Sequence, residues 1–121
     1  MRNLTDKVTF RHGATISTRT AQSPMLTNSG LDEKITQDTV DYYNMRSQSA
    51  GMVIVEYTSV SPNGGPSRSW APNREQLAIY NDNFVPGFKK IAEGLKKDGN
   101  KAILQLVHSG REAQYRITLG G

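Results

Sequence analysis

Two short segments of the chain are apolar on both sides of an extended strand, and this pattern restricts the possible folds more than any other feature. They read GMVIVEYTSV (residues 51–60) and KAILQLV (residues 101–107). An antiparallel strand with one face in water alternates apolar and polar residues, whereas a parallel strand covered by helices is apolar throughout. The segments therefore predict parallel strands over about 52–58 and 101–107.

An amphipathic helix is predicted before each of these strands. Over 83–98 the apolar side chains recur with a helical period, Pro86 falls in the first turn, where it is tolerated, and Gly99 suits a left-handed cap. The helix predicted over 37–49 has a narrower apolar face and begins after Thr36, a residue type that favours the N-cap.

The first part of the chain completes the predicted fold. Apolar runs on either side of His12 and Gly13 predict a β-hairpin over about 8–17, and residues 19–25 predict a further, weaker strand. The expected order is hairpin, strand, helix, strand, helix, strand. This is an α/β fold of the type (βα)2β, with right-handed crossovers and unpaired strand edges.

The composition limits the kinds of site that are expected. The chain of 121 residues fits one domain, and with no cysteine and two histidines a disulfide framework or a metal site is not expected. The net charge of +4 comes from scattered basic residues without interleaved aromatic side chains, so no nucleic-acid partner is expected. No apolar run reaches the roughly 18 residues of a membrane helix, which favours a cytoplasmic protein without membrane contact.

Gln105 is unusual because it lies inside an apolar strand. Alternation places it on the face opposite His108. A planar amide that offers a donor and an acceptor suits a heterocycle edge with carbonyl and N–H groups, although neighbouring backbone could also satisfy it. For His108, a position in the core or just behind the ligand-contacting residues, with a bond to a backbone carbonyl, is the commoner alternative to a ligand or acid–base role.

Glu56 lies inside the other apolar strand, where a carboxyl group has to be neutral or paired. By the order of the strands, Arg19 and Arg111 are the nearest cations. The sequence therefore predicts a structural ion pair between Glu56 and one of these arginines.

Three segments, in this order, resemble the old yellow enzyme family of FMN-dependent NAD(P)H:flavin oxidoreductases. They are RTAQSPMLTNSG, YYNMRSQSAGMVIVEYTSVSPNGG and the stretch from LAIYNDNF to LVHSGR. The resemblance covers residues from about 8 to 113. It implies the N-terminal (βα)2β part of a TIM (β/α)8 barrel, which as a whole needs about 250 residues.

The resemblance also implies a function and a cofactor site. Family members pass a hydride from NAD(P)H through FMN to an activated alkene or a similar small-molecule acceptor. Many of them carry Thr or Cys at the position of Leu26, which cannot donate a hydrogen bond. The positions that match flavin contacts of the family are Ser23, Pro24, Met25, Leu26, Tyr57 and Gln105.

By the same resemblance, the catalytic residues and the phosphate site are expected beyond residue 121. The isolated 121 residues are then expected to bind FMN weakly or not at all and to be inactive. An alternative from another class is a non-enzymatic structural or interaction module. In either case, unpaired strand edges predict a homo-oligomer.

Overall fold

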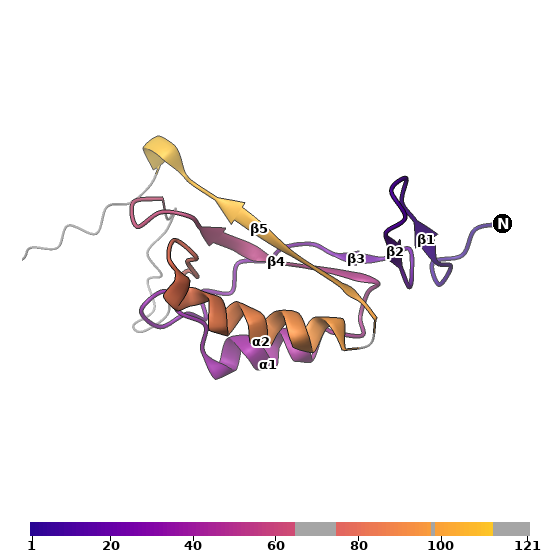
Figure 1. Cartoon of the computed structure of the whole chain (residues 1–121), viewed down its shortest axis with the longest axis horizontal. Helices are drawn as coiled ribbons and strands as arrows, with labels where there is room; N and C mark the ends of the chain where they lie inside the picture. Colours follow the sequence, from indigo (N-terminus) through magenta and orange to yellow (C-terminus); the bar gives the residue numbers. More distant parts are fainter. Residues whose placement is uncertain (65–74, 98, 113–121) are drawn as a thin grey trace, which may run out of the picture.

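The computed structural model describes residues 1–64, 75–97 and 99–112, and it confirms the predicted α/β order of strands and helices (Figure 1). The 3-10 helix η1 directly precedes α2, and the 3-10 helix η2 follows β5. The elements are β1 (Val8–Thr9), β2 (Thr15–Ile16), β3 (Ala21–Gln22), α1 (Gln37–Asn44), β4 (Met52–Ser59), η1 (Asp82–Phe84), α2 (Val85–Lys96), β5 (Lys101–Val107) and η2 (Gly110–Glu112).

The strands form two separate sheets. β1 and β2 pair antiparallel as the predicted hairpin, and the larger sheet has the order β3-β4-β5. Both pairings in the larger sheet are parallel, with Ala21 opposite Met52 and Met52 opposite Lys101. The inference that doubly apolar strands are parallel neighbours is therefore confirmed.

β3 is much shorter than the strand predicted over 19–25, because another segment lies along the C-terminal end of β4. Residues 75–79 occupy this position, and Ala78 bridges Ser59 in parallel. The Ser59 amide donates to the Leu77 carbonyl at 3.0 Å, and the Ile79 amide donates to the Ser59 carbonyl at 2.8 Å. The chain that follows Gln22 consequently leaves the sheet.

α1 ends at Asn44, earlier than the predicted 49, and its beginning agrees with the sequence. The Thr36 side chain accepts a hydrogen bond from the Thr39 amide, so it is the N-cap as predicted. After Asn44, the hydroxyls of Ser47 and Ser49 donate to the carbonyls of Asn44 and Arg46. Such local bonds compete with the helical pattern and favour turns.

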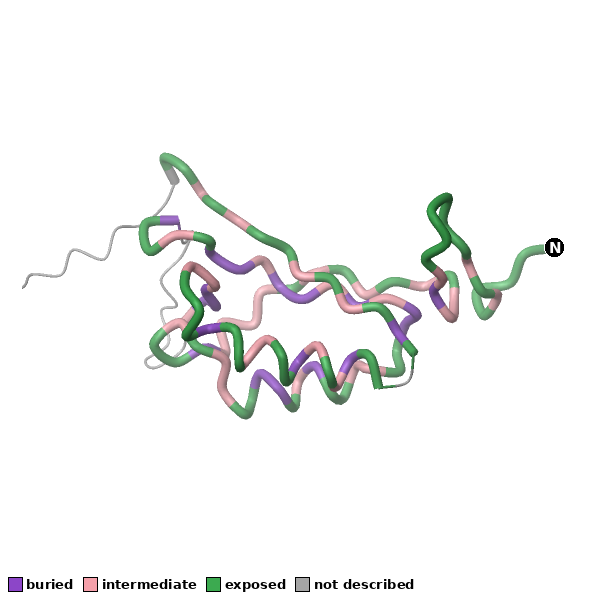
Figure 2. The backbone as a smooth tube through the Cα atoms, in the orientation of Figure 1, coloured by how far each residue is buried: buried purple, intermediate pink, exposed green. Residues whose placement is uncertain are grey.

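Both helices cover the same face of the sheet, and the core lies between them and β4 (Figures 1 and 2). Its buried members are Val40, Tyr43, Val53, Val55, Ile91 and Leu95. The opposite face is open in the described part of the chain, where Ile103, which alternates with the core-facing Ala102 and Leu104, is 44% exposed. Neither described helix combines the length and the apolarity required to span a bilayer.

Gly51 tests the close contact between the start of β4 and the segment before β3. A Cβ atom at this position would lie 2.7 Å from the Thr18 backbone nitrogen. We expect Gly51→Ala to lower the free energy of unfolding by about 1–3 kcal/mol, measured by urea denaturation. In the control Gly94→Ala the new methyl meets the movable tip of Asn44, and alanine favours the helix, so an equal loss there would contradict this account.

Candidate functional site

A surface concavity of about 340 Å³ lies where β4 and β5 end. It is lined by Tyr57, Gln105, Leu106, Val107 and Ser109. Two of the predicted site residues, Tyr57 and Gln105, are thus brought together from different strands. Gln105 is exposed, and its amide makes no hydrogen bond to any residue that the structure describes. Its side chain is therefore not satisfied by neighbouring backbone.

Tyr57 reaches this concavity because β4 carries an extra residue. Val55 lies opposite Leu104, but the next pair is Thr58 with Leu106. Two residues of β4, Glu56 and Tyr57, consequently face Gln105 alone. Such an irregularity re-aims side chains at the end of a strand, and here Glu56 is buried while Tyr57 is half-buried.

Glu56 is fully buried, and its partners are neutral groups. Its carboxylate accepts hydrogen bonds from the Thr27 amide at 3.0 Å, the Thr27 hydroxyl at 2.7 Å and the Tyr43 hydroxyl at 3.1 Å. The Tyr43 oxygen also accepts from the Glu56 amide at 2.9 Å. The predicted ion pair with Arg19 or Arg111 is therefore wrong, because these groups surround the carboxylate from α1 and from the segment after β3.

Burial holds Tyr43 in its protonated form. Desolvation, followed by the negative charge of Glu56, raises the pKa of the Tyr43 phenol far above its ordinary value. A protonated phenol can donate to the Glu56 carboxylate and accept from the Glu56 amide at the same time. Tyr43 thus satisfies both a side-chain and a backbone group of the same buried residue.

A chain of hydroxyl groups extends from Thr27 to the beginning of α1. The Thr27 and Ser29 hydroxyl oxygens lie 2.7 Å apart, and the Ser29 and Thr39 hydroxyl oxygens also lie 2.7 Å apart. The Thr36 hydroxyl donates to the Ser29 carbonyl at 2.8 Å. These bonds join the segment that follows β3 to the first turn of α1.

The predicted residues 23–26 precede Thr27 and do not line the concavity. Ser23 and Met25 are exposed, Met25 by 61%, while Pro24 and Leu26 are half-buried. They form the segment without regular secondary structure between β3 and the hydroxyl chain. The C-terminal end of this segment is held in place by the hydrogen bonds of Thr27 to Glu56.

His108 is exposed, so its predicted position in the core is wrong. Its Nδ1 accepts a hydrogen bond from the Gly110 amide at 3.0 Å. A Cβ at Gly64 would lie 2.8 Å from the imidazole Cδ2, which shows how closely the ring packs there. His108 thus shapes the turn after β5.

Sequence reasoning missed Gln76, whose amide nitrogen donates to the Tyr57 carbonyl at 3.3 Å. It is only 6% exposed. The residue follows a stretch rich in Gly, Pro and Ser, and neither helical nor strand periodicity distinguishes it. A buried partner of the site was therefore hidden in what reads as a loop.

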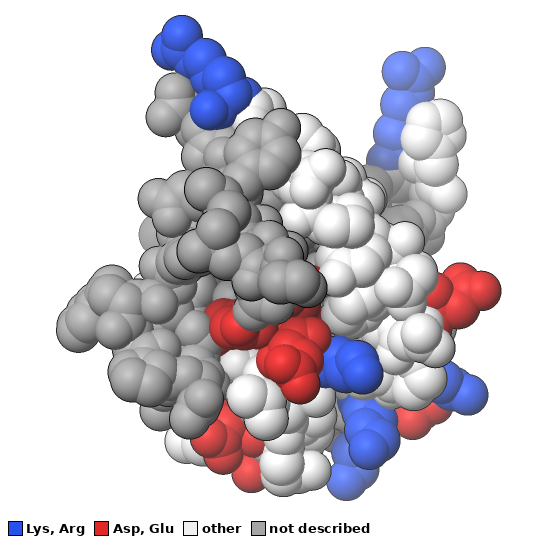
Figure 3. Space-filling view, turned by 90° about the vertical axis from the view of Figure 1, so that its left-hand side faces the viewer, with Lys and Arg blue, Asp and Glu red and all other residues white. Residues whose placement is uncertain are grey.

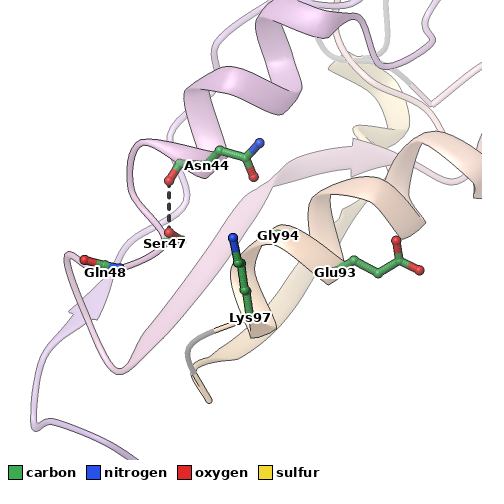
Figure 4. Close-up of a pocket in the computed structure, with 6 residues that line it drawn as sticks. All are labelled: Asn44, Ser47, Gln48, Glu93, Gly94 and Lys97. Carbon is green, nitrogen blue, oxygen red and sulfur yellow. Dashed lines mark hydrogen bonds between the residues drawn. The ribbon is translucent and has the colours of Figure 1, made fainter.

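A second hollow, of about 560 Å³, lies between the C-terminal ends of α1 and α2 (Figure 4). It contains none of the predicted site residues. Its lining is polar and comprises Asn44, Ser47, Gln48, Glu93, Gly94 and Lys97. Among the described residues, no group of three or more His, Cys, Asp or Glu is placed to hold a metal ion.

The end of the molecule at which β4 and β5 finish carries charges of both signs. On the face shown in Figure 3, basic and acidic side chains are interspersed and do not form one continuous basic patch among the coloured atoms. Charge therefore does not mark a binding site at this end, and the hydrogen-bonding groups of Gln105 and Tyr57 are its more specific feature.

The model of the NADH:flavin oxidoreductase / NADH oxidase family matches residues 7–120, and the chain belongs to this family. It is 37% identical over 121 residues to NADH:acrylate oxidoreductase of Vibrio harveyi, and the aligned region covers 99% of this chain and 12% of that protein. It is 36% identical over 115 residues to the probable NADH-dependent flavin oxidoreductase YqiG of Bacillus subtilis, which covers 94% of this chain and 29% of that protein. The chain thus spans less than a third of the length of these relatives.

Solved structures are similar over the same part. Old Yellow Enzyme from Pichia sp. AKU4542 matches with a TM-score of 0.78 and 26% identity, over 92% of this chain and 28% of that one. Morphinone reductase in complex with tetrahydroNAD matches with a TM-score of 0.78 and 25% identity, over 93% of this chain and 29% of that one. The predicted old yellow enzyme family and partial TIM-barrel fold are confirmed, and FMN and NAD(P)H are confirmed as the cofactors of the family.

Tyr43→Phe tests the hydrogen bonds around Glu56. The change leaves the Glu56 amide without its acceptor and removes one donor from the carboxylate. We expect the free energy of unfolding to fall by about 1–3 kcal/mol, measured by urea denaturation. The neighbouring Tyr42→Phe is the control, with an expected change within about 0.5 kcal/mol. Equal effects of the two substitutions would contradict the role given to the Tyr43 hydroxyl.

Proposed function

We propose that these residues form the flavin-facing part of an FMN-dependent NAD(P)H oxidoreductase. The observation that carries this proposal is the exposed Gln105 amide, which has no partner among the described residues and lies beside Tyr57 at the carboxyl ends of two parallel strands. In α/β barrels these strand ends are where ligands bind. Membership of a flavin oxidoreductase family supports FMN as this ligand.

The available groups fit one edge of a flavin ring. The Gln105 amide offers a donor and an acceptor to the carbonyl and N–H groups of the pyrimidine ring, and Tyr57 offers a half-buried aromatic surface. We assign backbone and packing contacts to Ser23, Pro24, Met25 and Leu26. Because Leu26 has no hydrogen-bonding side chain, it contributes shape alone.

The reaction proposed for the whole protein is reduction of an activated alkene or a similar small acceptor. FMN supplies the chemistry when bound, since it takes up hydride from a nicotinamide and passes it on. Two relatives, NADH:acrylate and NADH:fumarate oxidoreductase, are named for such alkenes, which supports this acceptor class. The residues described here orient the ring, and none of them is assigned a proton-transfer role.

Gln105→Leu tests the proposed contact. We expect FMN titrated into isotope-labelled protein to shift the Gln105 side-chain amide resonance in NMR spectra, a method that detects weak binding. Leucine should weaken FMN binding by about 1–3 kcal/mol, because polar edges of the ring lose their partners. Gln37→Leu, a change of an exposed glutamine on α1, should leave the affinity unchanged.

Two outcomes would contradict the proposed contact. One is equal FMN affinity of the wild type and Gln105→Leu. The other is the absence of any FMN-dependent shift at Gln105 up to millimolar FMN.

Self-association is a second proposal, and it is supported by the open face of the sheet. Ile103 on this face is 44% exposed, and β5 has a paired neighbour on one side only within the described residues. Exposed apolar side chains next to an unpaired strand edge favour contact with another strand. We propose that a second copy of the chain covers this face.

Light scattering after gel filtration tests this association. We expect the mass to exceed 13.4 kDa and to rise with protein concentration. Ile103→Lys should reduce the mass because it places a charge on the proposed contact. Val85→Lys changes an equally exposed side chain on α2, which is 48% exposed, and should have no effect. A constant monomer mass for the wild type would contradict the proposal.

A further inference from the structure

Gln76 lies in the segment that pairs with the end of β4. Glu75 bridges Gly30 in an antiparallel arrangement, and Ala78 bridges Ser59 in parallel. The Ser59 amide donates a hydrogen bond to the Leu77 carbonyl, and the Ser59 carbonyl accepts one from the Ile79 amide. This segment therefore holds the last residues of β4 in place.

The side chain of Gln76 continues this pattern by one step. Its amide nitrogen donates to the Tyr57 carbonyl at 3.3 Å. Tyr57 belongs to the irregular part of β4, between the pairs Val55–Leu104 and Thr58–Leu106. A carbonyl inside the fold needs a hydrogen-bond donor, and the Gln76 side chain supplies one here.

The other half of the Gln76 amide is left without a partner. Its Oε1 atom is buried and accepts no hydrogen bond from any residue that the structure describes, and Gln76 is only 6% exposed. A buried acceptor without a donor costs stability, and such exceptions to good packing concentrate at functional sites. An apolar side chain of the same size would leave the Tyr57 oxygen unpaired in place of the Gln76 oxygen, so stability alone does not require a glutamine here.

We propose that Gln76 is a positioning residue for the flavin site. Its amide nitrogen fixes the Tyr57 carbonyl and thereby sets where Tyr57 lies relative to Gln105 in the concavity. Gln76 does not line the concavity, so it acts through Tyr57 and makes no contact with the ligand. The link to FMN rests on the function proposed above, whereas the effect on Tyr57 and Gln105 does not depend on it.

Gln76→Met is the test, because methionine has nearly the same size and removes both the donor and the unpaired acceptor. In the wild type the unpaired oxygen is Gln76 Oε1. In the variant it is the Tyr57 carbonyl oxygen, which has lost its donor. Because the number of unpaired oxygens stays the same, the Tm should change by less than about 4 °C. The Tyr57 carbonyl carbon and Gln105 amide resonances should move. FMN affinity should fall about fivefold, because Tyr57 is no longer held in place beside Gln105.

Gln22→Met is the matched control. Gln22 is a half-buried glutamine of β3, and its Oε1 accepts from the Ser49 hydroxyl at 3.3 Å. This change should leave the resonances of Tyr57 and Gln105 and the FMN affinity unaltered. It shows whether losing a glutamine elsewhere in the sheet is sufficient to disturb the site.

Two results would overturn the inference. In the first, Gln76→Met leaves the Tyr57 and Gln105 resonances where they are in the wild type. In the second, the protein loses more than about 4 °C in Tm or fails to fold, which would make Gln76 a stabilising residue. If the wild type shows no FMN-dependent shifts, the proposed function fails, while the comparison of resonances still decides the role of Gln76.

Discussion

The buried carboxylate of Glu56 is the constraint on which the rest of this structure depends. A fully buried carboxyl group in an apolar strand is tolerated only when its oxygens are hydrogen-bonded. Thr27 and Tyr43 meet this requirement from two different parts of the chain. The need to satisfy one side chain therefore fixes α1 and the segment after β3 against β4.

The same interaction connects the core to the candidate site. The Tyr43 hydroxyl oxygen accepts a hydrogen bond from the Glu56 amide. This amide is therefore not available to pair with a neighbouring strand. The register of β4 and β5 shifts at this point, and Tyr57 comes to face Gln105 beside the concavity. Packing on the helical face of the sheet thus determines which side chains are presented at the strand ends.

The sequence predicts those features that depend on repeating patterns. The doubly apolar strands, the period of α2 and the N-cap at Thr36 each follow from local residue types. Gln105 stands out as an amide inside an apolar strand, and the family resemblance added Tyr57 as a candidate. The register shift, the partners of Glu56 and the contact of Gln76 with Tyr57 could not be predicted in this way. They arise where segments far apart in the chain meet, and no periodicity records such meetings.

The central claim is that Thr27 and Tyr43 act together through Glu56, although neither is bonded to the other in the structure. A double-mutant cycle of Thr27→Val and Tyr43→Phe, followed by urea denaturation, measures this directly. The account predicts that the effects of the two substitutions differ from a simple sum by about 0.5–3 kcal/mol. Additivity within about 0.3 kcal/mol would contradict it, because that is the behaviour of independent sites.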